Sequence, residues 1–147
     1  MAETKKNKTE KVIKEKTIPS KYIQAIGRRK EAIAIVRLSK DKPQIIVNNK
    51  NLNDYFPVES LQNKILEPFS KAKIENKFLI TVKVKGGGIT GQAEAIRLAI
   101  SRALVKLDNS LKPTLKKYKL LTRDSRAVER KKYGLKKARK RPQWAKR

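Results

Sequence analysis

The sequence contains no cysteine and no histidine. The chain therefore cannot form disulfides, a Cys/His zinc site or a thiol nucleophile, and it lacks the usual general base near neutral pH. No apolar run approaches the roughly 18 residues that cross a bilayer, and residues 1–16 have no apolar core like that of a secretory signal. Much enzymology is thus excluded, no metal or cofactor is expected, and a cytosolic protein is predicted.

Acidic residues are also scarce, at 13 against 39 Lys and Arg, so the formal net charge is +26. Such a field favours a polyanionic partner, and nucleic acid is the first candidate. The charge is uneven, because residues 1–21 carry a net +4, residues 22–111 a net +8 and residues 112–147 a net +14. This last segment is too polar to bury a core and is typical of a nucleic-acid-binding tail.

The length of 147 residues suits one globular domain with appended segments. Residues 1–20 show no sustained apolar periodicity and are predicted to be a disordered N-terminal extension. Residues 21–111 are predicted to form a globular α/β RNA-binding domain. Residues 112–147 are predicted to be an extended basic C-terminal tail.

Apolar periodicity predicts the order β-β-β-α-β-α in the body. The predicted elements are strands over residues 22–26, 31–38 and 44–48, a helix over 58–71, a strand over 78–85 and a helix over 93–107. Pro68 is expected to kink or end the first helix. Beyond Pro113 only short helices are suggested, over 116–121 and 127–132. The predicted fold class is α+β, a two-layer α/β sandwich with its helices on one face and an extended basic tail.

Glycines at positions 86, 88 and 91 have the spacing of a dinucleotide-binding loop between a strand and a helix. The acidic residue that should end the next strand is missing, because Asp108 lies at the end of the helix. A phosphate loop would need Lys followed by Ser or Thr, where the chain has Gln92 and Ala93. A small nucleotide-dependent enzyme is therefore disfavoured.

Two other roles remain open for this glycine loop. Gly86, Gly87 and Gly88 would let the chain turn sharply between a buried strand and a buried helix. The helix N-terminus also offers unpaired N–H groups and a partial positive charge, with Lys83 and Lys85 beside it. An RNA phosphate would suit that position.

Further basic residues are candidate RNA ligands. In the body, Arg28, Arg29 and Lys30 follow the first predicted strand as a cluster, although a solvated turn would also explain them. The predicted rRNA-binding residues of the tail are Arg123, Arg126, Arg130, Lys131, Lys132, Lys136, Lys137, Arg139, Lys140, Arg141 and Trp144.

Several of the basic residues could have a purely structural role instead of binding RNA. Local ion pairs between Arg123 and Asp124, and between Glu129 and Arg130, would occupy part of the tail. Arg97, Arg102 and Lys106 share one side of the last predicted helix, and such a charged face is ordinary on a surface helix.

Four motifs in order resemble the ribosomal protein nine family of the bacterial small subunit. They are GRRKEAIAIV (27–36), VKGGGITGQAEAIRLAISRAL (84–104), LTRDSRAVERKKYGLKKARKRPQ (121–143) and the final AKR. The resemblance covers nearly all of the chain from about Tyr22 onward. Four ordered motifs are far more specific than one glycine loop.

The resemblance implies a body similar to the second domain of ribosomal protein five. It also implies a structural, non-catalytic component of the small-subunit head that binds the 3′ major domain of 16S ribosomal RNA beside neighbouring head proteins. In that family the last Lys-Arg, here Lys146 and Arg147, approaches the anticodon stem-loop of the peptidyl-site tRNA. A sequence-tolerant DNA-compacting protein is a further hypothesis that the charge alone leaves open.

Overall fold

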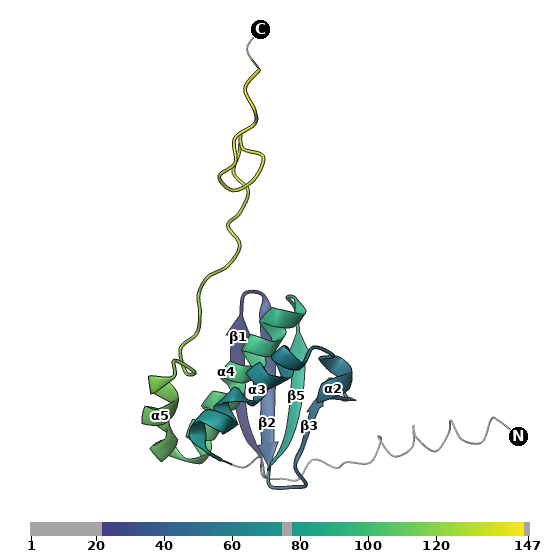
Figure 1. Cartoon of the computed structure of the whole chain (residues 1–147), viewed down its shortest axis with the longest axis vertical. Coiled ribbons are helices and arrows are strands. Elements are labelled where there is room, and N and C mark those ends of the chain that lie inside the picture. Colours follow the sequence, from purple (N-terminus) through teal and green to yellow (C-terminus); the bar gives the residue numbers. More distant parts are fainter. Residues whose placement is uncertain (1–21, 75–77, 146–147) are drawn as a thin grey trace, which may run out of the picture.

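The computed structural model describes residues 22–74 and 78–145, so the predicted extension over residues 1–20 and the tip residues Lys146 and Arg147 lie outside the described residues. A five-stranded sheet of order β1-β2-β5-β3-β4 forms one layer. Figure 1 shows α3 and α4 together on one side of this sheet and the C-terminal segment extending away from it. The predicted two-layer α+β sandwich is confirmed.

The elements follow the predicted order, with short additions. The strands are β1 (Ile23–Arg29), β2 (Ala32–Ser39), β3 (Gln44–Val47), β4 (Lys50–Asn51) and β5 (Leu79–Lys85). The helices are α2 (Leu52–Tyr55), α3 (Glu59–Ala72), α4 (Ile89–Leu107), the 3₁₀ turn η1 (Asn109–Leu111) and α5 (Lys112–Lys117). Neighbouring strands are antiparallel except β3 and β5, which are parallel and are connected through α3.

The first strand is longer than the one predicted over residues 22–26, and it takes in most of the residues expected to separate the first two strands. β1 continues through Gly27 to Arg29, and Arg29 pairs with Ala32 across a two-residue turn. Lys30 occupies that turn with a φ of 51°. Gly27 lies inside β1 and serves the packing of β1 on α4: a Cβ at this position would lie 2.0 Å from the carbonyl oxygen of Ala95. The glycine therefore allows strand and helix backbones to meet.

The core lies between the sheet and the two long helices. Alternate residues of β2 and β5, such as Val36 and Val82, are fully or almost fully buried against Ile96 and Ile100 of α4. Since the side chains of a strand alternate between faces, the residues between them point to the other side of the sheet. That other side carries charge, as described below.

Pro68 does not end α3, which was one of the two outcomes expected for it. The helix runs on to Ala72 and ends at Lys73, whose left-handed backbone donates its N–H to the carbonyls of Phe69 and Ser70. A proline inside a helix removes one backbone hydrogen bond. Here Pro68 is buried together with Ile65 and Phe69, so the packing of this face on the core offsets that loss.

Packed structure continues beyond residue 111, because Leu115 of α5 and Leu120 join the hydrophobic core. α5 begins at Lys112, earlier than the helix predicted over 116–121, which is therefore wrong in its bounds. The short helix predicted over residues 127–132 is not formed. The second prediction overestimated helical order, because lysines and arginines dominate that segment and few apolar residues can pack there.

Candidate nucleic-acid interface

The glycine loop between β5 and α4 is shaped by its backbone. Gly86 and Gly87 have φ values of 76° and 65°, a region that glycine enters without a steric penalty. A Cβ on Gly86 would lie 2.6 Å from the carbonyl oxygen of Glu31, and one on Gly87 would lie 3.0 Å from Ala32. These two glycines thus bring the loop against the β1–β2 hairpin, which supports their structural role.

The side chain of Gln92 lies where a phosphate loop would carry its lysine. Its Nε2 donates to the carbonyl of Gly86 at 3.1 Å, and its Oε1 accepts from the hydroxyl of Tyr55 at 2.9 Å. The side chain of Gln92 therefore connects the glycine loop to Tyr55 and stabilises the loop. Gly88 is the exposed N-cap of α4, and no atom of the part of the chain that the structure describes lies within 4 Å of a Cβ added there, so the start of the helix is open to solvent.

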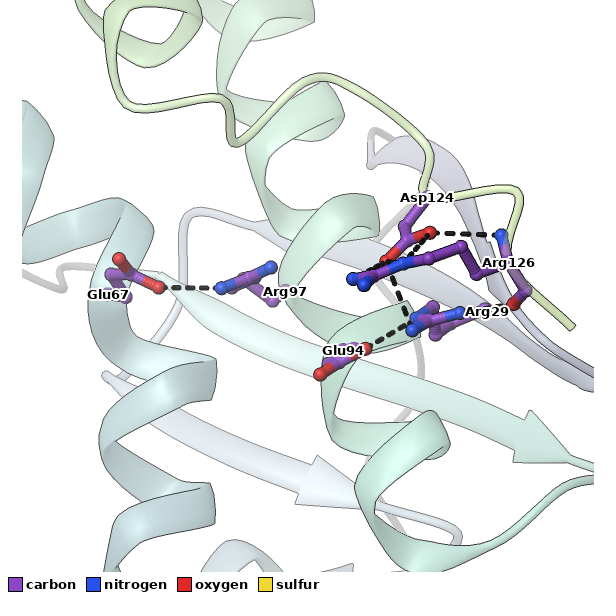
Figure 2. Close-up of polar contacts among 6 residues, drawn as sticks. All are labelled: Arg29, Glu67, Glu94, Arg97, Asp124 and Arg126. Atoms are coloured by element: carbon purple, nitrogen blue, oxygen red, sulfur yellow. Dashed lines mark hydrogen bonds and ion pairs between the residues drawn. The ribbon is translucent and has the colours of Figure 1, made fainter.

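Arg29 connects the body to the C-terminal segment (Figure 2). Its Nε lies 2.6 Å from a carboxylate oxygen of Glu94 on α4, and its Nη2 lies 3.0 Å from Asp124. Its Nη1 donates to the carbonyl of Arg126 at 2.6 Å. Only 11% of the Arg29 side chain is exposed. All three guanidinium nitrogens therefore have acceptors within the chain, and the geometry favours a positioning role over RNA contact for Arg29.

Asp124 is the tail residue that contacts both Arg29 and Arg126. It accepts hydrogen bonds from the backbone and side chain of Arg126, as Figure 2 shows, and these bonds hold the pKa of its carboxyl well below the usual value of 3.8. The alternative of a local Arg123–Asp124 pair was therefore wrong about the partner. We call residues 122–126 the tail root, because they attach the tail to the body.

Glu129 likewise pairs with a different arginine than expected. Arg139 donates from Nε to Glu129 at 2.9 Å, and this bond lowers the pKa of the Glu129 carboxyl. The backbone N–H of Lys136 donates to the carbonyl of Lys140 at 2.7 Å. These contacts close a small loop in the tail, visible in Figure 1.

The remaining basic residues of the tail face solvent. All the predicted tail ligands, from Arg123 to Arg141, are exposed, and so is Trp144. Among them, Arg126 and Arg139 form ion pairs in the described structure. Tyr133 and Trp144 are exposed large aromatic side chains, available to stack on bases.

The cations of α4 mostly serve the fold. Arg97 pairs with Glu67 of α3 at 2.9 Å (Figure 2). Arg102 and Lys106 donate to the carbonyls of Ile26 and Gln24 at 2.8 and 2.9 Å. Since β1 is an edge strand, these two bonds satisfy edge carbonyls that would otherwise be free to pair with another chain. The reading as an ordinary surface helix is favoured for this face.

In the body, the sheet gathers three of the predicted ligands on one side. Arg28, Lys83 and Lys85 occupy exposed positions that alternate with the buried positions of their strands, so they project from the face away from the helices. Lys30 is exposed in the hairpin turn.

The sequence matches a family model described as ribosomal protein S9/S16, and the match runs over residues 27–147. The matched range includes β1, the glycine loop, the tail root and the basic tail. The chain belongs to the ribosomal protein S9/S16 family. No helix among the described residues is long and apolar enough to cross a membrane.

Membership of the S9/S16 family makes this chain a structural protein of the small ribosomal subunit and not an enzyme. Its partners are the ribosome and ribosomal RNA, and its activity belongs to translation within a ribonucleoprotein. The nucleotide-dependent enzyme considered from the glycine spacing is therefore rejected.

Two features of this S9/S16 chain were missed at the level of sequence. Arg37 was not considered, although it alternates with buried residues in β2 and shares the face of Lys83; that alternation was a usable signal. The pairing of Arg29 with Asp124 carried no local signal, because the two residues meet only through the fold.

Proposed function

We propose that this chain binds the 3′ major domain of 16S ribosomal RNA in the head of the small subunit, in the cytoplasm and beside neighbouring head proteins. We further propose that Lys146 and Arg147 contact the anticodon stem-loop of the peptidyl-site tRNA. The family match supports the first part, and the likeness of the last two residues to the family's terminal Lys-Arg supports the second.

The observation that carries the proposal is an exposed cationic tail attached at its root. Residues 122–147, beyond the packed Leu115 and Leu120, carry a net charge of +10, and the tail's predicted ligands are exposed. Lysine and arginine in such a segment replace counterions along phosphates, so the affinity for RNA should fall steeply with salt. The tail root fixes where this segment leaves the body.

We propose the following residues as RNA ligands. In the body they are Arg28, Lys30, Lys83, Lys85 and the open helix end at Gly88, with Gly86 and Gly87 shaping that loop. In the tail they are Arg123, Arg126, Arg130, Lys131, Lys132, Lys136, Lys137, Arg139, Lys140, Arg141 and Trp144. Arg29 acts beside them by holding the tail root.

The test separates incorporation from tRNA binding. A chain lacking Lys146 and Arg147 should enter small subunits normally, while those subunits should retain less tRNA in the peptidyl site. A matched control, Lys5→Gln with Lys6→Gln, removes the same charge from the predicted N-terminal extension and should change neither measurement. Failure of the truncated chain to enter subunits would contradict the division between body and tip.

A DNA-compacting protein is the other class that charge allows, and competition binding distinguishes it. The full chain should prefer the 3′ major domain of 16S ribosomal RNA over random duplex DNA at matched phosphate concentration and salt. Equal affinity for both would favour compaction.

A further inference from the structure

The side of the sheet away from α3 and α4 presents an apolar centre. We call the outward positions of β1, β2 and β5 the open face. In β1 and β2 the exposed fractions of Ile26 and Ile33 are 41% and 38%, and Ile35 is half-buried between them. Ile26 lies directly opposite Ile35 in the strand register. Contiguous exposed apolar side chains of this kind mark interaction surfaces.

Cations surround this apolar centre. Ile33 lies between Arg28 on β1 and Lys85 on β5, and Lys83 lies opposite Ile35. Arg37 occupies the next outward position of β2. The other outward positions of these three strands are Gln24, Ser39, Leu79 and Thr81, so none of them is acidic. Four positive charges around the isoleucines make the open face complementary to a polyanion.

Arg37 is held in place before any partner arrives. Its guanidinium carbon lies 4.9 Å from the centre of the Tyr22 ring, and its Nε donates to Gln24 at 3.2 Å. Its other guanidinium N–H groups donate no hydrogen bond to any residue in the ranges 22–74 and 78–145. Because an arginine that is already ordered loses less side-chain entropy on binding, this arrangement favours a geometrically fixed phosphate contact.

We infer that the open face docks on the sugar-phosphate backbone of an RNA helix, with Arg28, Arg37, Lys83 and Lys85 on phosphates and the isoleucines against ribose. This inference rests on the proposed function and deepens it, because it joins body ligands proposed above with Arg37 and the isoleucines into one surface that fits one form of RNA. Isoleucine has no aromatic face on which a base can stack, so the surface does not suit single-stranded bases. An A-form helix, whose wide and shallow minor groove exposes ribose, fits a flat apolar strip bordered by cations.

The first test compares two variants of equal charge. Lys83→Gln with Lys85→Gln removes two cations of the open face, and Lys40→Gln with Lys64→Gln removes two exposed cations from elsewhere in the body. The probe is the transcribed 3′ major domain of 16S ribosomal RNA, bound by the full chain over a range of salt. The open-face variant should reduce the slope of log K against log salt by about 0.7 to 0.9 for each cation. The control should leave the slope nearly unchanged, and equal slopes for both variants would overturn the inference.

Ile33→Thr tests the apolar centre without changing charge. Threonine keeps the strand preference of a β-branched residue, and the position is half exposed, so the fold should persist, which circular dichroism checks. The affinity for the same RNA should fall several-fold while the salt slope stays constant. An unchanged affinity would overturn the proposed ribose contact.

Lysine acetylation read by mass spectrometry separates this inference from the proposed function. With the RNA probe bound, Lys83 and Lys85 should become protected and Lys64 should remain reactive. If the chain binds the probe while Lys83 and Lys85 stay reactive, the open face is not a docking surface and the proposed function stands. If the chain does not bind the probe at all, the proposed function fails. Protection in whole small subunits but not on RNA alone would indicate a protein neighbour and overturn the inference.

Discussion

The guanidinium of Arg29 lies 3.0 Å from the carboxylate of Asp124, which connects the end of the first strand to the root of the tail. The same guanidinium binds Glu94 on α4 and the carbonyl of Arg126. One arginine thus joins the sheet, the long helix and the tail. A flexible cationic segment that begins from a fixed point searches a smaller volume for its RNA partner, because fewer of its conformations place the charges elsewhere.

Replacing Asp124 by Asn should release the tail root. The variant keeps the shape of the side chain but removes the charge that Arg29 and Arg126 contact, so the charge-assisted hydrogen bonds that hold the tail root are lost. The heteronuclear NOE of the Arg126 amide should drop toward values of an unstructured chain, while amides of β5 stay unchanged.

Arg123→Gln is the matched control for this prediction. Arg123 is exposed and adjoins Asp124 in sequence, yet Asp124 takes its ion pairs from Arg29 and Arg126. The control should leave the Arg126 amide ordered. A tail root that is equally mobile in the unaltered chain and in Asp124→Asn would contradict the attachment described here.

The pH dependence of the tail root follows from the lowered pKa of Asp124. Because the carboxyl ionises more readily in the folded state than its ordinary value of 3.8 allows, the attachment is fully stabilised above that value. It weakens as the pH falls below 3.8 through the lowered pKa. Carboxyl carbon shifts should show Asp124 titrating below 3.8, and Arg126→Gln should move the transition upward, since Arg126 supplies the largest effect. A midpoint at or above 3.8 in the unaltered chain would refute the prediction.

Gly27→Ala should destabilise the body by about 3 kcal/mol, because overpacking forces backbone shifts. The added methyl would lie 2.0 Å from the carbonyl oxygen of Ala95 and 2.7 Å from the backbone nitrogen of Ala99. Gly88→Ala is the control: its Cβ meets open space at an ordinary φ of −93°, so its effect should stay within about 0.5 kcal/mol. Urea unfolding measures both, and similar midpoints for the two variants would show that β1 and α4 are less tightly packed.

Strand alternation and helical periodicity predicted the architecture, because both record which side chains face the core. Val82 and Val84 alternate with Lys83 and Lys85 in a half-buried strand, and this alternation placed β5 and its outward cations correctly. The apolar stripe of α4 was equally informative. Such patterns depend only on neighbours in the same element, so they can be read before the fold is known.

Contacts between elements could not be predicted in this way. Glycine is common in turns, but the reason for Gly27 is its close contact with Ala95 of α4, which is far away in the sequence. Pairing Asp124 with its sequence neighbour Arg123 was wrong, because Arg29 and Arg126 have better geometry in the folded chain. The helix end that was one expected outcome at Pro68 does not occur for the same reason, since burial of this helix face in the core outweighs the local preference of proline.

Trp144 provides the most direct report on contact between tail and RNA. It is the only tryptophan of the sequence, and 79% of it is exposed, so its emission in the free chain should resemble that of indole in water. Adding the 3′ major domain of 16S ribosomal RNA should quench or blue-shift this emission, because bases stack on exposed aromatic rings and exclude water.

Trp144→Ala should weaken binding by about 5- to 150-fold, as expected for about 1 to 3 kcal/mol of stacking. As a control, Tyr118→Trp with Trp144→Phe moves the probe to the residue that follows α5, beside Lys71, where RNA should leave the emission unchanged. Unaltered Trp144 emission at saturating RNA would show that the tail binds through its charges alone.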